Sequence, residues 1–209
     1  MSDLGNALAE GGEEMIMLGG GQPAHIPEVD AIWRQRMEEI MAKPINMPGS
    51  MEVMLGNYDP PSGTPAFLKA IAKMLTKHFG WDVTEKNIAI TSGGQTAFFF
   101  LFNALGGKMS DGRRKKILLP VVPEYIGYAN QSVGEDFFKA YKPIIEEIGD
   151  HHFKYRVDFD ALEITDDIAA ICVSRPTNPT GNVLTDTEMT RLADLAKQHG
   201  IPFIIDNAY

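Results

Sequence analysis

The sequence predicts an α/β protein built on a mostly parallel β-sheet. Short apolar segments, typical of buried strands, alternate with segments of helical periodicity over most of the chain. The 209 residues, 44% of them hydrophobic and 22% charged, are enough for a substantial core and exclude wholesale disorder. We therefore expect one substantial α/β domain with a shorter N-terminal part in front of it.

The helices are predicted from apolar periodicity and from residues that favour a first turn. Pro27 and Pro65 suit first turns, and Thr64 is placed to cap the second helix. The predicted helices are 27–42, 64–79, 95–105, 124–133 and 186–199. The side chains of the second helix that should face inward are Phe67, Leu68, Ile71, Met74 and Leu75. Phenylalanines on all sides of helix 95–105 predict that it is buried.

The strands are predicted from short apolar runs between these helices. They cover residues 87–91, 117–121, 138–145, 169–174 and 203–206. Residues 1–25 contain several glycines and are expected to be irregular. Residues 43–63 are rich in proline and glycine, so we expect a loop there.

Charge and cysteine content exclude several classes of protein. The formal net charge of −9 argues against non-specific binding to nucleic acid or to an anionic membrane. The single cysteine, Cys172, excludes an internal disulfide and a cysteine zinc cluster, and His151–His152 has no third ligand at a suitable spacing, so no metal site is expected. The N-terminus resembles neither a signal nor a transit peptide, and the longest apolar stretch, Ala97–Leu105, is too short to span a bilayer. We expect a soluble cytoplasmic protein.

The first motif, Ser92–Gln95, lies between a predicted strand and a helix. Two glycines permit a tight turn and a close approach of the backbone to a ligand. The helix N-terminus that follows would face an anion, ideally a phosphate. A tight turn without a ligand explains the motif equally well. It is neither a Walker loop nor a Rossmann glycine motif.

Two further motifs also follow predicted strands, at the edge where open α/β sheets bind ligands. Arg175–Gly181 contains two prolines that stiffen the backbone around Asn178, although a purely structural turn explains this composition better. Asp206 ends the last strand, where a poorly solvated carboxylate is costly unless it meets a cation such as a protonated pyridine nitrogen. A helix cap or a surface aspartate is the alternative.

Together and in this order, these motifs resemble the fold-type-I pyridoxal-phosphate aminotransferases. Asn178–Gly181 and the Asp-x-x-Tyr run Asp206–Tyr209 are the most specific marks. Three earlier segments, Gly21–Pro23, Tyr58–Gly63 and Pro123–Tyr125, agree with the family pattern, so the resemblance covers about residues 18–209. The segments GGGQPAHIPEV, SGGQTAFFFLFN and SRPTNPTGN are most similar to the branch that moves an amine between a valine- or alanine-type amino acid and a pyruvate-type 2-oxo acid.

The resemblance implies a three-layer sandwich with a mostly parallel sheet, incomplete at its C-terminal end. Residues 1–56 would form an N-terminal arm and part of a small domain. Residues 57–209 would form the N-terminal part of the large domain that binds pyridoxal 5'-phosphate.

The resemblance also implies roles for individual residues. Gly93, Gly94 and Gln95 would bind the cofactor phosphate, and Tyr125 would stack on the pyridine ring. Asp206 would pair with the pyridinium nitrogen, while Asn178 and Tyr209 would bind the phenolic oxygen of the ring.

Two further roles involve the substrate and a second subunit. Tyr58 would reach the phosphate of the neighbouring subunit in a homodimer, and Gly21 would lie near the substrate carboxylate. The substrates would be an amino acid and a 2-oxo acid.

One family feature has no counterpart in the sequence. The lysine that forms the Schiff base normally follows the Asp-x-x-Tyr motif, and no lysine up to Tyr209 has a matching context. We therefore expect the sequence to be the front part of a longer aminotransferase, with no catalytic residue of its own and with an open sheet edge.

Other functions stay open on the sequence alone. Another enzyme of the same fold, either a different aminotransferase or a β-elimination lyase, would share these motifs, and only the lyase would need no 2-oxo acid acceptor. A non-catalytic binding or regulatory domain is a further alternative. The short acidic segment before the first motif counts against a regulator, which would carry a basic winged-helix region there.

Overall fold

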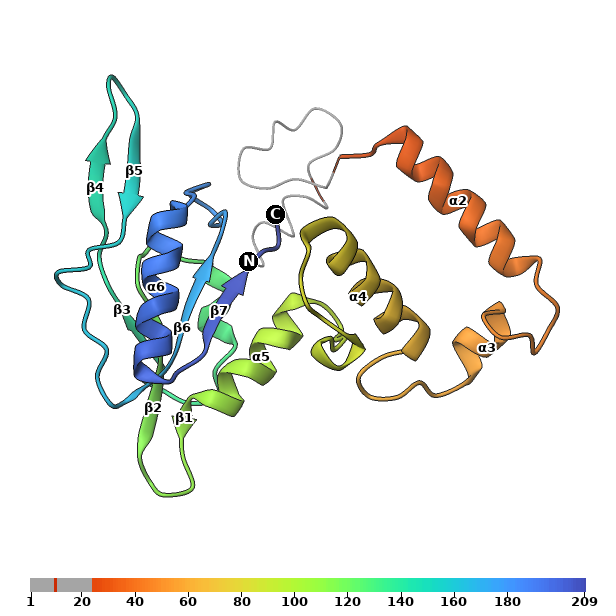
Figure 1. Cartoon of the computed structure of the whole chain (residues 1–209), viewed down its shortest axis with the longest axis horizontal. Helices are drawn as coiled ribbons and strands as arrows, with labels where there is room; N and C mark the ends of the chain where they lie inside the picture. Colours follow the sequence, from red (N-terminus) through yellow and green to blue (C-terminus); the bar gives the residue numbers. More distant parts are fainter. Residues whose placement is uncertain (1–9, 11–23) are drawn as a thin grey trace. The chain divides into compact units, whose positions relative to one another are not determined.

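The computed structural model of the protein describes residue 10 and residues 24–209. The chain divides between Asp59 and Pro60 into two compact units (Figure 1). We describe each unit by itself. The predicted assignment of residues 1–56 and 57–209 to parts of a small and a large domain stays a prediction.

The described part of the first unit holds two helices. The predicted first helix is confirmed as α2, Pro27–Met41, with its proline in the first turn and no buried residue. A second helix, α3, Met51–Gly56, lies where a loop was expected. The sequence signal for this helix is Ser50, whose hydroxyl accepts a hydrogen bond from the Val53 N–H. The prediction of a loop was wrong because it was based on the surrounding prolines and glycines and did not consider this cap.

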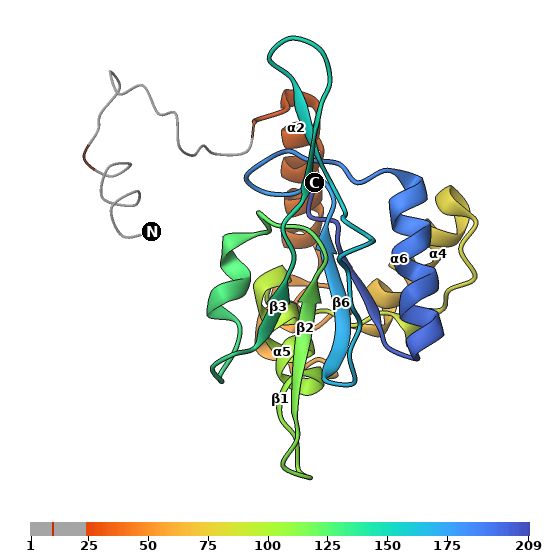
Figure 2. The same cartoon turned by 90° about the vertical axis from the view of Figure 1, so that its left-hand side faces the viewer.

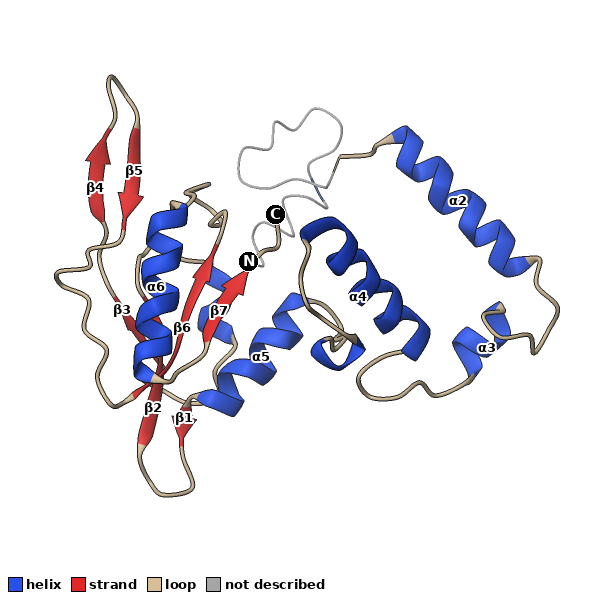
Figure 3. Ribbon diagram, in the orientation of Figure 1, coloured by secondary structure: helices blue, strands red, loops and turns tan. Residues whose placement is uncertain are grey.

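The second unit contains a parallel sheet, as predicted. Its order is β3–β2–β6–β7, and all three of these pairings are parallel. A two-residue strand, β1, joins the first half of β2 in antiparallel fashion. The bounds are β1 Gly107–Lys108, β2 Arg114–Leu119, β3 Phe138–Ala140, β6 Ile168–Ser174 and β7 Phe203–Asp206 (Figure 3).

Helices cover both faces of this sheet, which makes three layers. The helices of the unit are α4 Pro65–Phe79, α5 Gly94–Leu105 and α6 Asp186–His199, together with the short 3₁₀ helices η1 Glu85–Asn87 and η2 Ile126–Asn130. On one face Leu118, Ile171 and Val173 pack with Leu192 of α6. On the other face the alternate residues of the same strands pack with side chains of α5 and η2. Figure 2 shows β3, β2 and β6 side by side with α6 to one side.

Each long helix of this unit begins and ends at a recognisable residue. Thr64 stands before α4, although its side chain makes no hydrogen bond that caps the helix, and Gly80 ends α4 in the left-handed region at φ 69°. Thr185 and Glu188 form a capping box on α6. The residue before α5 is Gly93, with φ 95°, a backbone conformation that favours glycine.

Two expectations about buried helix faces were wrong. Leu68 of α4 is buried, but Phe67 and Met74 are about half exposed. In α5 only the i and i+4 pair Phe98 and Phe102 is buried, while Phe99, Phe100 and Leu101 are exposed. Each helix therefore buries one face and leaves large apolar side chains exposed on another.

Three predicted elements differ from the structure. The predicted strand 87–91 does not form: Asn87 belongs to η1, and residues 88–91 have no strand neighbour among the described residues. The run 138–145 is divided at Pro143 into β3 and β4, Ile144–Glu147, because proline lacks the N–H that a ladder needs. The predicted helix 124–133 is only the short η2.

A hairpin that the sequence did not predict projects from the unit (Figure 1). β4 pairs with β5, Phe153–Arg156, in antiparallel fashion and apart from the main sheet. Two side chains hold its base: Asn182 pairs with the backbone N–H and C=O of Tyr155, and Glu188 accepts from the Val157 N–H.

Candidate functional site

Three parallel strands of the second unit end at the same edge of the sheet. β6 ends at Ser174 and β7 ends at Asp206, and these two residues are in register. β2 leads through Pro120 to Glu124 and Tyr125. Since loops at the carboxyl ends of parallel strands converge on one edge, the polar side chains that follow these strands come together there.

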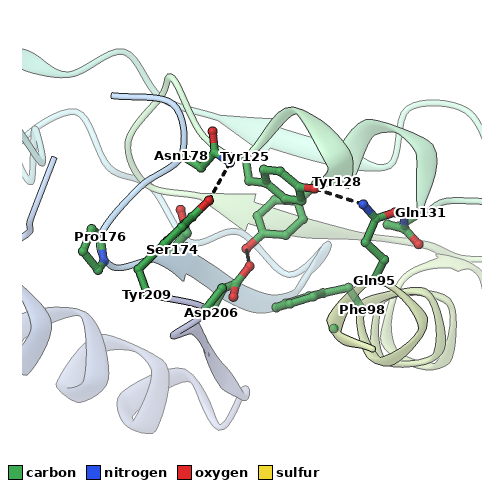
Figure 4. Close-up of a pocket in the computed structure, with 12 residues that line it drawn as sticks. Gln95, Phe98, Tyr125, Tyr128, Gln131, Ser174, Pro176, Asn178, Asp206 and Tyr209 are labelled. Carbon is green, nitrogen blue, oxygen red and sulfur yellow. Dashed lines mark hydrogen bonds between the residues drawn. The ribbon is translucent and has the colours of Figure 1, made fainter. Parts of the chain in front are cut away.

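A cavity of about 230 Å³ lies at this edge (Figure 4). This volume exceeds the roughly 150 Å³ that holds a benzene ring in a protein core. Its lining includes these residues singled out from the sequence: Gly94, Gln95, Tyr125, Asn178, Asp206 and Tyr209. It also includes Pro176 and Ala208, which lie inside the predicted motifs. Four further lining residues were missed by the sequence analysis: Phe98, Tyr128, Gln131 and Ser174.

The N-terminus of α5 forms one wall. Gly93 takes a positive φ, and a Cβ added at Gly93 or Gly94 would meet no atom within 4 Å. The first backbone N–H groups of the helix have no partner within the helix, and the space at these two glycines is open. Such a terminus attracts anions through these N–H groups and through the helix dipole.

Asp206 is held by a phenol from the opposite side of the cavity. The Tyr128 hydroxyl donates a hydrogen bond of 2.8 Å to Asp206 Oδ2. Tyr128 is only 2% exposed, and burial, together with Cys172 and Asp206, raises the pKa of its hydroxyl. Tyr128 therefore stays protonated and remains a donor. In the part of the chain that the structure describes, Asp206 forms no ion pair with Lys, Arg or His.

A second carboxylate, Glu124, lies beneath the cavity. It accepts hydrogen bonds from the backbone N–H groups of Tyr125 and Ser174 and from the Ser174 hydroxyl. Burial raises the pKa of the Glu124 carboxyl above its usual value, the nearby Asp206 adds to the rise, and the three donors oppose it. Glu124 thus connects the loop after β2 to the end of β6.

The loop after β6 brings Asn178 to the cavity. The Asn178 amide donates a hydrogen bond of 2.9 Å to the Tyr209 hydroxyl. Thr177, which is buried, donates from its hydroxyl to the Ser174 carbonyl, and its own N–H donates to the Asn182 carbonyl. The Asn178–Pro179 peptide bond is cis. The loop is therefore tied at several points and places Asn178 beside the residue that ends the Asp-x-x-Tyr motif.

Three residues of the predicted site do not line this cavity. Gly93 directly precedes Gly94, which does line it. Tyr58 lies in the first unit, where its side chain is fully exposed. Gly21 lies outside the described residues. The functional roles expected for all three stay predictions.

Tyr128 is the residue that sequence reasoning should have found. It follows Tyr125 by three residues, and residues three apart lie on the same side of a helical turn. The predicted helix 124–133 already implied that both rings face one direction. Gln131 and Ser174 carried no such signal, because their places depend on contacts across 36 and 50 positions of sequence.

The comparisons with known proteins agree on one family. The model of the family "Aminotransferase class I and II" matches residues 14–209. The chain belongs to the class I and II aminotransferases. This confirms the family resemblance inferred from the motifs, and the three-layer α/β fold with its mostly parallel sheet agrees with it.

Individual aminotransferases match the whole chain. Valine–pyruvate aminotransferase of Escherichia coli is 48% identical over 209 residues, which is all of this chain and 48% of that protein. The crystal structure of valine-pyruvate aminotransferase from Salmonella typhimurium is 45% identical with a TM-score of 0.81, covering 100% of this chain and 49% of the other. A structure from Psychrobacter arcticum, assigned to the amino-acid aminotransferases, is 43% identical with a TM-score of 0.88, covering 99% and 50%. The chain thus spans about half the length of these relatives.

Two features are absent from the described residues. None of their helices is long and apolar enough to cross a membrane. They also contain no group of three or more His, Cys, Asp or Glu side chains placed to hold a metal ion.

Proposed function

We propose that the protein takes part in pyridoxal-phosphate-dependent transfer of an amine from a valine- or alanine-type amino acid to a pyruvate-type 2-oxo acid. One observation carries the proposal: the loops after three parallel strands bring Asp206, Tyr125 and the Asn178–Tyr209 pair to one cavity beside the N-terminus of α5. The names of the relatives support the choice of amino acid and 2-oxo acid.

The residues around the cavity fit this cofactor. The N-terminus of α5, with open space at Gly93 and Gly94, suits a phosphate group. Asp206, which has a phenol donor but no cationic partner among the described residues, suits a protonated ring nitrogen. Asn178 and Tyr209 offer hydrogen-bonding groups for the phenolic oxygen, and Tyr125 offers an aromatic face. When bound, pyridoxal phosphate supplies an electron sink for the substrate carbon that loses its proton.

The chain's own residues would tune that chemistry. Asp206 would hold a proton on the ring nitrogen, and the Tyr128 hydroxyl would keep the carboxylate aimed at it. Asn178 would fix the direction of the Tyr209 hydroxyl through their mutual hydrogen bond. These roles need little movement, because each side chain is already positioned by a neighbour.

Three parts of the proposal concern groups outside this cavity. Tyr58 would bind the phosphate in the neighbouring subunit of a homodimer, and its full exposure leaves it available for that contact. Gly21 would lie near the substrate carboxylate. The Schiff-base lysine would come from beyond Tyr209. We also expect the enzyme to act in the cytoplasm.

The test is an assay of the full-length protein with valine and pyruvate, with and without Asp206→Asn. The substitution keeps the shape and a hydrogen-bond acceptor for Tyr128 but removes the charge, so we expect turnover to fall at least 100-fold while the melting temperature changes little. Turnover, without any 2-oxo acid, of an amino acid that carries a leaving group on its β-carbon would indicate a β-elimination lyase instead. Near-normal turnover in the variant would exclude Asp206 as the ring-nitrogen partner.

A further inference from the structure

We propose that Gln131 and Gln95 orient the Tyr125 hydroxyl so that its proton is donated into the cavity, to an anionic oxygen of the bound ligand. Tyr125 would then be a hydrogen-bond donor in addition to an aromatic surface. The inference rests on the proposed function, which supplies a ligand with such an oxygen.

The direction of the hydrogen bonds carries the inference. Gln131 Nε2 donates to Gln95 Oε1 at 3.1 Å, so the oxygen of the Gln95 amide is occupied as an acceptor. Gln95 Nε2 then faces the Tyr125 hydroxyl oxygen at 2.9 Å. An amide nitrogen can only donate, so the phenol oxygen accepts and its single proton is left for another partner. Within residues 24–209, Tyr125 Oη makes no further hydrogen bond.

Gln131 is fixed in this orientation by its surroundings. It is only 8% exposed, and its Nε2 also donates to the Gly127 carbonyl at 3.3 Å. Rotating its amide by half a turn would bring two oxygens together at both contacts. Its own backbone carbonyl accepts from Asn103 Nδ2 of α5 at 2.7 Å, which ties η2 to that helix.

Packing against Gly127 and Tyr128 fixes the position of the Tyr125 ring. A Cβ built on Gly127 would come within 2.3 Å of Tyr125 Cε1 and 2.6 Å of Cζ, so the ring occupies the space that any other residue at 127 would fill. On another side the ring meets Tyr128 edge-on, with the centroids 5.4 Å apart. The hydroxyl is therefore held at the cavity wall by packing as well as by Gln95 (Figure 4).

The position of the Tyr125 hydroxyl indicates which kind of group its proton would bind. Gln95, the partner of the hydroxyl, is in the first turn of α5, so the hydroxyl lies beside the end of the helix that attracts anions. A phosphate of the cofactor and a carboxylate of the substrate both present such an oxygen. The experiment distinguishes these two sources.

Two substitutions in the full-length protein test the donor. Tyr125→Phe keeps the ring and removes the proton. Gln131→Glu leaves no donor at that position, so the Gln95 amide should turn to donate to the carboxylate and to accept from Tyr125, which withdraws the proton from the cavity. Each variant should lower the affinity for the affected ligand by about 10- to 100-fold, as expected for the loss of a hydrogen bond to a charged group. Gln198→Glu, on the exposed side of α6, adds the same charge elsewhere as a control.

The ligands are pyridoxamine 5'-phosphate, which needs no covalent bond to the protein, pyridoxamine without phosphate, and pyruvate. If the phosphate is the acceptor, both variants lower the affinity for pyridoxamine 5'-phosphate and leave the affinity for pyridoxamine unchanged. If the substrate carboxylate is the acceptor, both variants raise the KM for pyruvate and leave cofactor affinity unchanged. Either result supports the role of the Tyr125 hydroxyl as a hydrogen-bond donor to the ligand. Melting curves show that the variants are folded.

The double variant separates orientation from simple charge repulsion. If Gln131→Glu acts by turning the amides, it has no further effect once Tyr125 is Phe. An equal effect in both backgrounds, or no effect of Tyr125→Phe on any ligand, overturns the inference. Failure of the unchanged protein to bind pyridoxamine 5'-phosphate overturns the proposed function itself, so the two failures are distinguishable.

Discussion

At the scale of single residues, the site depends on polar side chains that hold one another. Asp206 is held by Tyr128, Tyr209 by Asn178, and the Tyr125 backbone by Glu124. The first two pairs each join the ends of two different strands or their loops, and Glu124 reaches the end of β6 through Ser174. A change to one member therefore acts on the site through its partner as well as directly.

Glu124 gives the stability of the fold a specific dependence on pH. Its pKa is raised in the folded protein, chiefly by burial, so the folded state binds this proton more tightly than the unfolded state. The contribution that this protonation makes to stability is complete below the ordinary glutamate pKa and is lost as pH rises through the raised value. Relative to Glu124→Gln, the free energy of unfolding of the unchanged protein should fall as pH rises from about 4 towards neutral.

Denaturant unfolding of both proteins at a series of pH values measures this difference. Titrating groups that do not interact with Glu124 cancel in the comparison, because they are common to both proteins. A difference in unfolding free energy that stays constant over this pH range would contradict the raised pKa of Glu124.

At the scale of elements, the prediction from the sequence was best for helices, whose hydrogen bonds and end signals lie within a short stretch of chain. The helices α2, α4, α5 and α6 begin and end close to their predicted bounds, because proline, caps and left-handed glycines are local signals. Strands depend on neighbours far away in the chain, and residues 88–91 are apolar enough for a strand but have no partner among the described residues.

The same distinction applies to the candidate site. Gly94, Asn178 and Asp206 were found because they lie in recognisable motifs: Gly94 begins α5, Asn178 follows β6, and Asp206 ends β7. Gln131 and Ser174 were missed because their contacts come from packing between distant segments.

Glu188 joins two elements, and its loss should destabilise both. It caps α6 through Thr185 and also accepts from the Val157 N–H at the base of the hairpin. Burial opposes its ionisation, but the backbone donors of Thr185 and Val157, the Thr185 hydroxyl and Arg156 lower its pKa overall. Glu188→Ala would leave the buried Val157 N–H without its acceptor and should cost about 2 kcal/mol or more of unfolding free energy.

Denaturant unfolding at neutral pH measures this cost, with Asp194→Ala on an exposed turn of α6 as the matched control. The control should change stability by no more than about 0.5 kcal/mol. Because the pKa of Glu188 is lowered in the folded state, its contribution should be present at neutral pH and be lost as pH falls through that lowered value. Equal effects of the two substitutions would contradict the joining role of Glu188.

At the scale of the whole molecule, the architecture explains why these residues meet. Three parallel strands with helices on both faces bring their following loops to one edge, and α5 directs its N-terminus to the same place. The family membership and this geometry both bear on the same edge of the sheet. They lead to the same proposal, a pyridoxal-phosphate site at this edge of the sheet.

The most direct test of that proposal is the near-ultraviolet and visible absorption spectrum of the full-length protein loaded with pyridoxal phosphate. Addition of valine alone should convert the bound cofactor to its amino form, and later addition of pyruvate should restore the starting spectrum, since the reaction consists of two half-reactions. A spectrum that valine leaves unchanged, in protein that is folded and has bound the cofactor, would contradict the proposed transamination.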